Sequence, residues 1–146
     1  MKRLYLDMNI YNRPFDDQSQ LRIRLETIAI HSILKMIREK KFTLLWSFML
    51  EYENSLNPFE EIMMEIKMTS ALASEYIASA KDVLKHAKEF ELKGIKPRDA
   101  IHLACSIKGK AGYFLTCDDK LIKKAPTIKT ETAIINPLDF IRMEVN

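Results

Sequence analysis

The sequence predicts an α/β fold in which helices cover both faces of a central parallel sheet of four to five strands, a three-layer α/β/α sandwich. Short apolar runs alternate along the chain with longer segments whose apolar residues recur at helical spacing. Strands separated by helices pair in parallel through right-handed crossovers, which place the helices on the faces of the sheet. The 146 residues, 47% of them hydrophobic, suffice for one sizeable core, so we expect a single domain over residues 1–146.

Two short apolar runs in the first half of the chain predict buried strands. Between them, loop-type residues precede a long amphipathic helix, whose basic residues gather at its C-terminal end, where the helix dipole favours them. The apolar residues of this helix are Leu21, Leu25, Ile28, Ile33, Met36 and Ile37. In order, the predicted elements are a strand over 4–6, a loop over 11–19, a helix over 20–40, a strand over 42–48, and short helices over 49–56 and 58–67.

The second half is predicted to begin with a long helix over residues 70–92, which Gly94 ends. Pro97 is tolerated in a first helical turn and therefore opens the next helix. The remaining predicted elements are a helix over 97–108, a strand over 113–116, a short helix from 118, a strand over 132–135 and a terminal helix from 137.

Acidic residues follow three of the predicted strands at their carboxyl ends. In open α/β sheets ligands bind at the carboxyl ends of the strands, so these acids can meet in one crevice. One further acid lies near the start of the helix over 97–108, which can face the same crevice. The set comprises Asp7 after the first strand, Glu51 and Glu53 after the second, Asp99 in the helix, and Asp118 with Asp119 after the third.

Such a cluster favours metal-dependent phosphodiester hydrolysis. Carboxylates within a few ångströms of one another repel unless some are protonated or a divalent cation compensates their charge. Oxygen ligands suit Mg²⁺ or Mn²⁺, which keep several waters and accept further ligands from phosphate. One ion, or two about 4 Å apart, activates a water and neutralises charge on the phosphate and the leaving oxygen.

Four short motifs occur in order along nearly the whole chain. They are Asp7 with Asn9; Ser47 with Glu53; Asp99, Ala100, Ile101, His102, Leu103 and Ala104; and Thr116, Asp118 and Leu121. Together with Asn136, Pro137 and Phe140 near the end, this order resembles the PIN domain family of metal-dependent ribonucleases, in particular its VapC-like toxins.

The resemblance implies an acidic crevice that binds Mg²⁺ or Mn²⁺ and cuts single-stranded or structured RNA. It also implies a toxin of a bacterial or archaeal toxin–antitoxin pair, so we expect an RNA substrate, an antitoxin partner and a homodimer. We assign Asp7, Glu53, Asp99 and Asp118 as catalytic acids, Asp7, Asp99 and Asp118 as metal ligands, and Asn9, Ser47 and Thr116 as supporting residues that orient the carboxylates.

Two acids of the set have open roles. Glu51 and Glu53 point about 200° apart on a helix, so one of them faces solvent, and the spacing from Ser47 favours Glu53 as the site residue. For Asp119 we expect a solvent-facing position rather than a metal role. His102 is predicted to be a satisfied core histidine rather than a base.

Basic residues flank two of the acids and can hold substrate phosphates on either side of the metal. These residues are Lys96, Arg98, Lys120, Lys123 and Lys124. Runs of lysine more commonly form solvated faces, and that alternative stays open. The net charge of +3 is compatible with a polyanionic partner without requiring one.

Four other functions fit parts of the pattern. A haloacid-dehalogenase-like phosphatase also uses an acid after the first strand, but it requires a second acid where Asn9 stands. A receiver domain needs its acidic pair after the first strand, and a nucleotide-binding module needs a phosphate-cradling loop that three glycines do not provide. A PIN-like module that binds RNA or protein without cutting stays open as an alternative.

The location of the protein follows from what the sequence lacks. No run approaches the roughly 18 apolar residues that span a bilayer, and the N-terminal residues do not resemble a signal peptide, so we expect a cytoplasmic protein without membrane contact. Cys105 and Cys117 lie in apolar surroundings without the spacing of a zinc site, which predicts reduced buried thiols, with a disulfide as the alternative.

Overall fold

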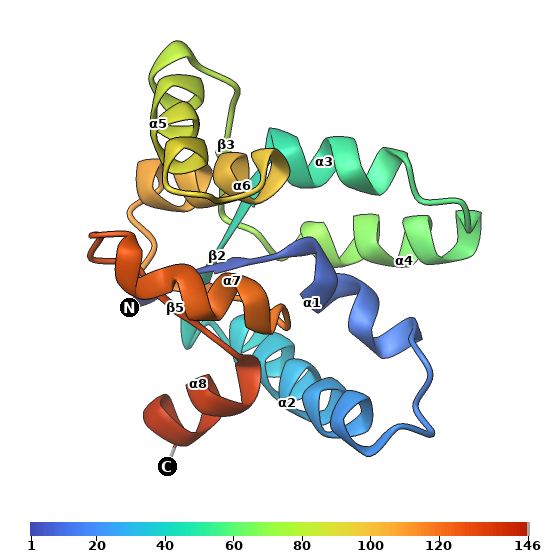
Figure 1. The fold of residues 1–146 in the computed structure, drawn as a ribbon. Helices are drawn as coiled ribbons and strands as arrows, with labels where there is room; N and C mark the ends of the chain where they lie inside the picture. The colour runs from blue at the N-terminus through green and yellow to red at the C-terminus, as the bar shows by residue number, and fades with distance from the viewer. Residues whose placement is uncertain (146) are drawn as a thin grey trace.

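A five-stranded parallel sheet forms the centre of the protein in the computed structural model, which describes residues 1–145 (Figure 1). The strand order is β3-β2-β1-β4-β5, and every neighbouring pair is parallel. This arrangement confirms the predicted α/β class with a parallel sheet. The strands are β1 (Lys2–Leu6), β2 (Phe42–Ser47), β3 (Glu75–Ile77), β4 (Tyr113–Leu115) and β5 (Ala133–Ile135).

Helices cover both faces of the sheet. In Figure 1, α2 and α8 lie on one side of the strands, and α3, α5 and α6 lie on the other. The helices are α1 (Met8–Asn12), α2 (Leu21–Arg38), α3 (Phe48–Ser55), α4 (Glu60–Ser70), α5 (Lys81–Leu92), α6 (Pro97–Lys108), α7 (Asp119–Lys124) and α8 (Pro137–Glu144), with 3-10 turns η1 (Arg13–Phe15) and η2 (Ala125–Thr127).

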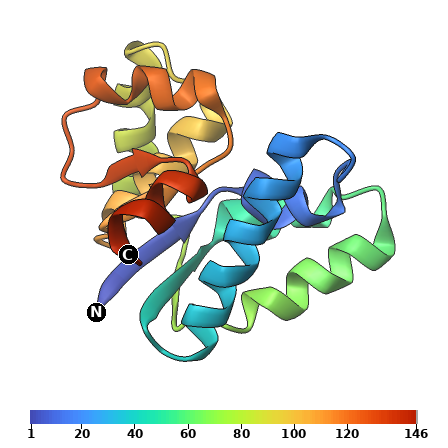
Figure 2. The same cartoon turned by 90° about the horizontal axis from the view of Figure 1, so that it is seen from below.

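The central strand β1 is the axis from which the sheet is wound. The chain adds β2 and β3 on one side of β1 and later adds β4 and β5 on the other, so the winding direction reverses between β1 and β4. Figure 2 shows β1 passing through the middle of the molecule, with α2 on one side and α7 on the other. Ligand crevices of open α/β sheets lie at such a reversal, outside the carboxyl ends of the strands.

Burial explains why β1 is so apolar. Leu4, Tyr5 and Leu6 are fully buried, as expected of a strand whose two faces are both covered by helices. They belong to one continuous core cluster that includes side chains of all five strands. The ring of Tyr5 stacks on Phe114 of β4 with 5.4 Å between the ring centroids.

The segment after β1 differs from the prediction of a loop over residues 11–19. Helix α1 and the turn η1 occupy most of it. Asp7 accepts the N–H of Met8 through Oδ1 (2.8 Å) and so caps α1, while Ile10 and Tyr11 are buried. Pro14 stands in the first turn of η1, where a missing N–H costs nothing. The turn-forming residues therefore gave the wrong prediction for the first half of this segment.

The predicted long helix over residues 70–92 is also wrong in its first part. Residues of β3 pair in parallel with β2, and the helix α5 begins only at Lys81. Ile77 is buried against the core, whereas Glu75 is exposed and forms an ion pair with Arg3 of β1. Pairing with a distant strand overrides the local helical spacing here. The added strand brings the sheet to five, the upper end of the predicted range.

The buried face of α2 is rotated from the predicted one in the N-terminal half of the helix. Ile33 and Ile37 are buried as predicted, but Leu21, Leu25 and Ile28 are exposed. Glu26 is fully buried instead, among cationic and amide groups described below.

Two further expectations concern the thiols and the membrane. Cys105 and Cys117 are both buried and free, as predicted. Among residues 1–145 no helix combines the length and apolarity needed to cross a bilayer.

Candidate active site

Asp7 lies directly beyond β1, where its backbone N–H donates to the carbonyl of Leu115 at the end of β4 (2.9 Å). Its side chain is 5% exposed, and Oδ2 accepts from Asn9 Nδ2 (3.1 Å) and Thr116 Oγ1 (2.9 Å). Burial raises the pKa of Asp7, although the hydrogen bond from Thr116 lowers it. Asp7 is thus a fixed, buried carboxyl at the reversal between β1 and β4.

Hydrogen bonds of Asn9 and Thr116 join the segment after β1 to the segment after β4. Thr116 Oγ1 accepts from Asn9 Nδ2 (3.0 Å) and from the backbone N–H of Asp118 (3.1 Å). Asn9 Oδ1 accepts from the backbone N–H of Cys117 (3.0 Å). Because the groups that Asn9 and Thr116 contribute are neutral, they hold Asp7 and the backbone of Asp118 in place without adding charge.

Asp118 is the N-cap of α7. Its Oδ1 accepts the backbone N–H of Lys120 (2.9 Å) and of Leu121 (3.4 Å). Both capping bonds go to the same oxygen. Capping therefore occupies one oxygen of the Asp118 carboxylate.

Glu53 reaches the same region from α3. Its Oε1 lies 2.5 Å from Nε2 of His102 on α6, and its Oε2 lies 3.7 Å from a guanidinium nitrogen of Arg98. Burial lowers the pKa of His102, but the hydrogen bond to Glu53 and the charges of Asp7, Glu53 and Asp99 outweigh it, so the pKa is raised. Glu53 is thus held between two basic groups.

Asp99, in the first turn of α6, interacts with all the other acids. Burial and the charges of Asp7, Asp118 and Glu53 together raise its pKa to about 6, against the opposing charge of His102. Asp99 and Asp118 line one cavity, Thr116 joins the carboxyl of Asp7 to the backbone of Asp118, and Glu53 contacts His102, one turn from Asp99. These contacts bring the four acids together from four separate segments of the chain.

This coupling leads to a prediction for the metal-free protein. Replacing Asp7 with Asn is expected to lower the pKa of Asp99, because it removes the neighbouring charge with the largest raising effect. The measurement is a titration of the Asp99 side-chain carboxyl carbon by NMR. The control is Asp119→Asn, which alters a carboxyl paired elsewhere. An unchanged Asp99 pKa in Asp7→Asn would show that the two carboxyls are not neighbours.

Glu51 and Asp119 lie outside the cluster. Glu51 accepts from the indole Nε1 of Trp46 (2.8 Å), on the other side of α3 from Glu53. Asp119 accepts two hydrogen bonds from the guanidinium of Arg22 (2.6 and 2.7 Å) and is exposed. Of the two glutamates, Glu53 is the one that shares the site.

Ser47 is placed differently from the prediction that it orients a carboxylate. It is fully buried at the end of β2, where its Oγ accepts the N–H of Leu50 (3.2 Å) and lies 2.6 Å from the hydroxyl of Tyr5. Tyr5 Oη in turn lies 2.6 Å from Nδ1 of His102. Ser47 therefore reaches the acid site only through two other side chains.

The contact between Tyr5 and His102 was not predicted from the sequence. Tyr5 was predicted to be an apolar strand residue, and His102 a core histidine whose partner was not named. A signal was present, since Tyr5 and Asp7 are two residues apart and share a face of an extended segment.

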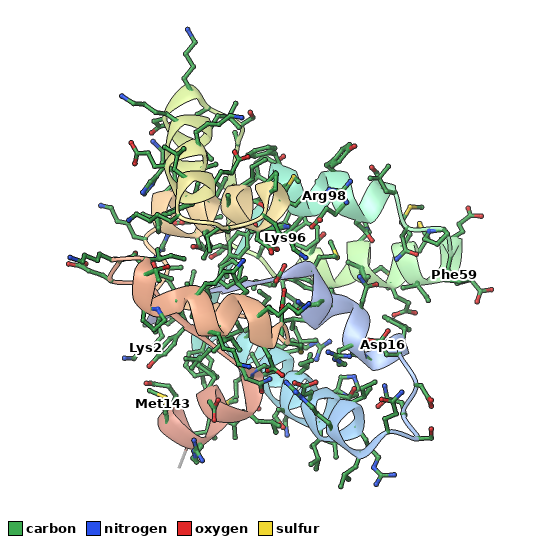
Figure 3. The ribbon with its side chains drawn as sticks, viewed as in Figure 1. Lys2, Asp16, Phe59, Lys96, Arg98 and Met143 are labelled. Carbon is green, nitrogen blue, oxygen red and sulfur yellow. The ribbon has the colours of Figure 1, made fainter. Side chains whose placement is uncertain are left out.

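Basic residues stand on two sides of the acids. A cavity of about 290 Å³ is lined by Asp99 and Asp118 together with Lys96, Lys120 and Lys123. Lys124 turns to the carbonyl of Gly94 (2.7 Å). Arg98, beside Glu53, lies over the ring of Tyr52. Figure 3 shows Lys96 and Arg98 at the start of α6, between α7 and α3.

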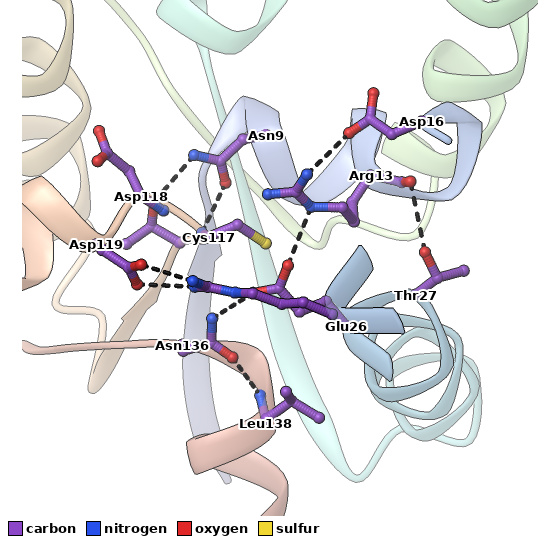
Figure 4. A network of polar contacts seen from close by, with 12 residues as sticks. Asn9, Arg13, Asp16, Glu26, Thr27, Cys117, Asp118, Asp119, Asn136 and Leu138 are labelled. Carbon is purple, nitrogen blue, oxygen red and sulfur yellow. Dashed lines mark hydrogen bonds and ion pairs between the residues drawn. The ribbon is translucent and has the colours of Figure 1, made fainter. Parts of the chain in front are cut away.

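A second polar cluster, centred on Glu26, lies beside the site (Figure 4). Glu26 is paired with Arg13 Nε (3.2 Å) and Arg22 Nε (3.4 Å), and it accepts from Asn136 Nδ2 (2.6 Å). Since Arg22 also binds Asp119, this cluster ties α2 to η1, to the start of α7 and to the cap of α8.

The donor set of the acid cluster suits a hard divalent cation. Asp7, Asp99 and Asp118 offer carboxylate oxygens, the ligands that Mg²⁺ and Mn²⁺ prefer. Within residues 1–145, no three His, Cys, Asp or Glu side chains are arranged to hold a metal ion directly. An ion that keeps several of its waters fits this arrangement, because water can bridge it to the more distant carboxylates.

Comparison with known proteins adds a fold likeness. No protein-family model matches the chain, and no curated protein does. The crystal structure of VapBC2 from Rickettsia felis bound to a DNA fragment from their promoter contains a chain with a similar fold, at a TM-score of 0.62 and 17% sequence identity. The match covers 92% of this chain and 98% of that chain. The predicted PIN-like fold is thereby confirmed over nearly the whole length.

Proposed function

We propose that this chain, with its PIN-like fold, is an Mg²⁺- or Mn²⁺-dependent endoribonuclease. The observation that carries the proposal is the gathering of Asp7, Glu53, Asp99 and Asp118 at the reversal of the sheet, where burial and the charges of the other three acids raise the pKa of Asp99 to about 6. Mutual repulsion of this kind is relieved by a divalent cation.

Each group of residues at the site would have a separate role in cleavage. Asp7, Asp99 and Asp118 would hold the cation, partly through waters that it keeps, and the bound cation would supply positive charge for the phosphate and lower the pKa of water. Glu53, fixed by His102, would orient the attacking water or accept its proton. Lys96, Lys120 and Lys123 line the adjoining cavity and would bind phosphates of the RNA backbone.

The phosphatase alternative is weakened by the position of Asn9. Its amide is fully engaged with Asp7, Thr116 and the N–H of Cys117, and an amide does not exchange protons as an acid does. The third candidate, an RNA-binding module without cleavage, would keep the lysine-lined cavity but would not need the acids.

One assay separates the three functions. We expect the protein to cut a labelled RNA in the presence of Mn²⁺, to lose this activity on addition of a chelator, and to leave a generic phosphomonoester intact. Turnover of the phosphomonoester would support the phosphatase. Binding of the RNA without cleavage at any concentration of Mn²⁺ or Mg²⁺ would support the binding module.

The biological setting is the second part of the proposal. The structure with the similar fold is a VapBC2 complex bound to promoter DNA, and together with the sequence motifs it supports a toxin with an antitoxin partner. We propose further that the protein is a homodimer that acts in the cytoplasm. Co-purification with any small protein encoded in a neighbouring reading frame tests the partner, and the mass of the purified protein in solution tests the oligomer.

A further inference from the structure

A continuous row of hydrogen-bonded polar side chains runs from the core of the sheet to the acid site. Its members are Ser47 at the end of β2, Tyr5 on β1, His102 on α6 and Glu53 on α3. Ser47 and Tyr5 are fully buried, and His102 is 1% exposed. The three links measure 2.6, 2.6 and 2.5 Å, so each is a short hydrogen bond.

The donors of this row can be ordered from its two ends. The Glu53 carboxylate only accepts, so Nε2 of His102 carries the hydrogen that it donates to Oε1. In the neutral ring Nδ1 accepts from the Tyr5 hydroxyl, and in the protonated ring Nδ1 donates to it. Ser47 accepts the N–H of Leu50, and its hydroxyl donates to Tyr5 in the first case and accepts from Tyr5 in the second. In both cases Nε2 of His102 donates to Glu53.

We infer that Tyr5 and His102 are positioning residues of the acid site, which hold the Glu53 carboxylate toward the other three acids through this hydrogen-bonded row. The inference rests on the proposed nuclease function. Hydrogen bonds to one ring nitrogen of a histidine determine how the other nitrogen meets its partner, and losing such a support typically costs about 10–100-fold in metal affinity or activity.

Packing alone does not account for the Tyr5 hydroxyl. The ring stacks on Phe114 and meets His102 edge-on, and a phenylalanine would keep both ring contacts. A buried hydroxyl without a partner is costly, so its presence at the centre of an apolar strand is explained by the two bonds it makes. Removing the Tyr5 hydroxyl therefore tests its role in positioning His102 while leaving the packing of the ring unchanged.

The chain offers a matched control in Tyr11. It is also buried, packs edge-on against Trp46, and its hydroxyl has no hydrogen-bond partner among the residues described. Tyr11→Phe thus makes the same chemical change in the same core, outside the row.

The experiment compares Tyr5→Phe, Tyr11→Phe and the wild type in two measurements. The first is ¹⁵N and ¹H NMR of the His102 ring in metal-free protein, in which the Nε2–H proton is expected to be downfield and slow to exchange in the wild type and in Tyr11→Phe. In Tyr5→Phe we expect faster exchange of this proton. The second is RNA cleavage with Mn²⁺, in which Tyr5→Phe is expected to lower kcat about 10-fold with little change in KM.

Opposite results overturn the inference. A Tyr5→Phe variant that cleaves with the kcat of the wild type is one such result, and equal losses in Tyr5→Phe and Tyr11→Phe are another, because they would indicate packing. A second variant, His102→Gln, keeps an N–H donor for Glu53 and is expected to retain more activity than His102→Leu. If the wild type does not cut RNA, the proposed function fails, and the exchange rate of the His102 ring proton still decides whether Tyr5 holds this ring.

Discussion

Replacement of Asp99 by asparagine is expected to lower Mn²⁺-dependent RNA cleavage by about 100-fold or more while the fold is kept. The amide has nearly the shape of the carboxyl group but lacks its charge, and it is a poorer ligand for a hard cation. Asp99 is the acid that interacts with all three others, so its charge matters most to the cluster. Cleavage of a labelled RNA under single-turnover conditions measures the loss.

The same variant is expected to be more stable than the wild type at pH 8 without metal. The pKa of Asp99 is raised from 3.8 to about 6 in the folded protein, so folding disfavours its ionised form. The contribution of Asp99 to the stability of the metal-free wild type therefore falls as the pH rises from 3.8 to about 6 and stays constant above that, and Asp99→Asn removes this dependence. Urea unfolding at about pH 4 and about pH 8, below and above this window, measures it.

Asp119→Asn is the matched control for both measurements. This carboxyl is next to Asp118 in the chain but is bound by Arg22, so its loss should leave cleavage within about twofold of the wild type. A cleavage rate in Asp99→Asn equal to that of the control would remove Asp99 from the assigned site.

Replacement of Glu26 by glutamine is expected to lower the free energy of unfolding by about 3 kcal/mol. Glu26 is fully buried and faces two guanidinium groups, those of Arg13 and Arg22. Glutamine has the same shape but removes the buried negative charge that these two cations share, although Arg22 keeps Asp119 and Arg13 keeps Asp16. Breaking one side of a buried ion pair is far more costly than breaking an exposed one. Urea unfolding curves give the difference.

The control for this change is Glu39→Gln at the end of the same helix. Glu39 pairs with Lys41 at 3.5 Å, and both side chains are exposed. We expect its loss to change stability by less than about 1 kcal/mol. Equal unfolding curves for Glu26→Gln and Glu39→Gln would show that the Asp16 carboxylate, 3.2 Å from Arg13, compensates the charge by itself.

The parts of the fold that sequence predicted well are those encoded locally. The apolar runs of β1 and β2 mark buried strands, and the acids Asp7 and Asp118 follow strands that the topology makes neighbours. Parallel pairing then brings the strand ends to one edge of the sheet. For this reason the convergence of acids could be anticipated before any coordinates were known.

The parts that were missed depend on partners distant in the sequence. The strand β3 exists because it pairs with β2, and nothing in residues 75–77 alone distinguishes it from a helical turn. Glu26 is buried because Arg13, Arg22 and Asn136 surround it, which reverses the usual preference of a carboxylate for solvent. The contact of Tyr5 with His102 joins residues 97 apart, so the spacing of Tyr5 and Asp7 indicates the face on which Tyr5 lies but not its partner.

The position of β1 between β2 and β4 has a consequence for synthesis on the ribosome. Strand β1 finds its second neighbour only when residues 113–115 have emerged, and Asp118 follows a few residues later. A nascent chain that has not reached Asp118 holds Asp7 and Glu53 but cannot assemble them with it. Any hydrolytic activity of the cluster is therefore withheld for roughly 6 to 22 seconds after Asp7 is made, at about 5–20 residues per second.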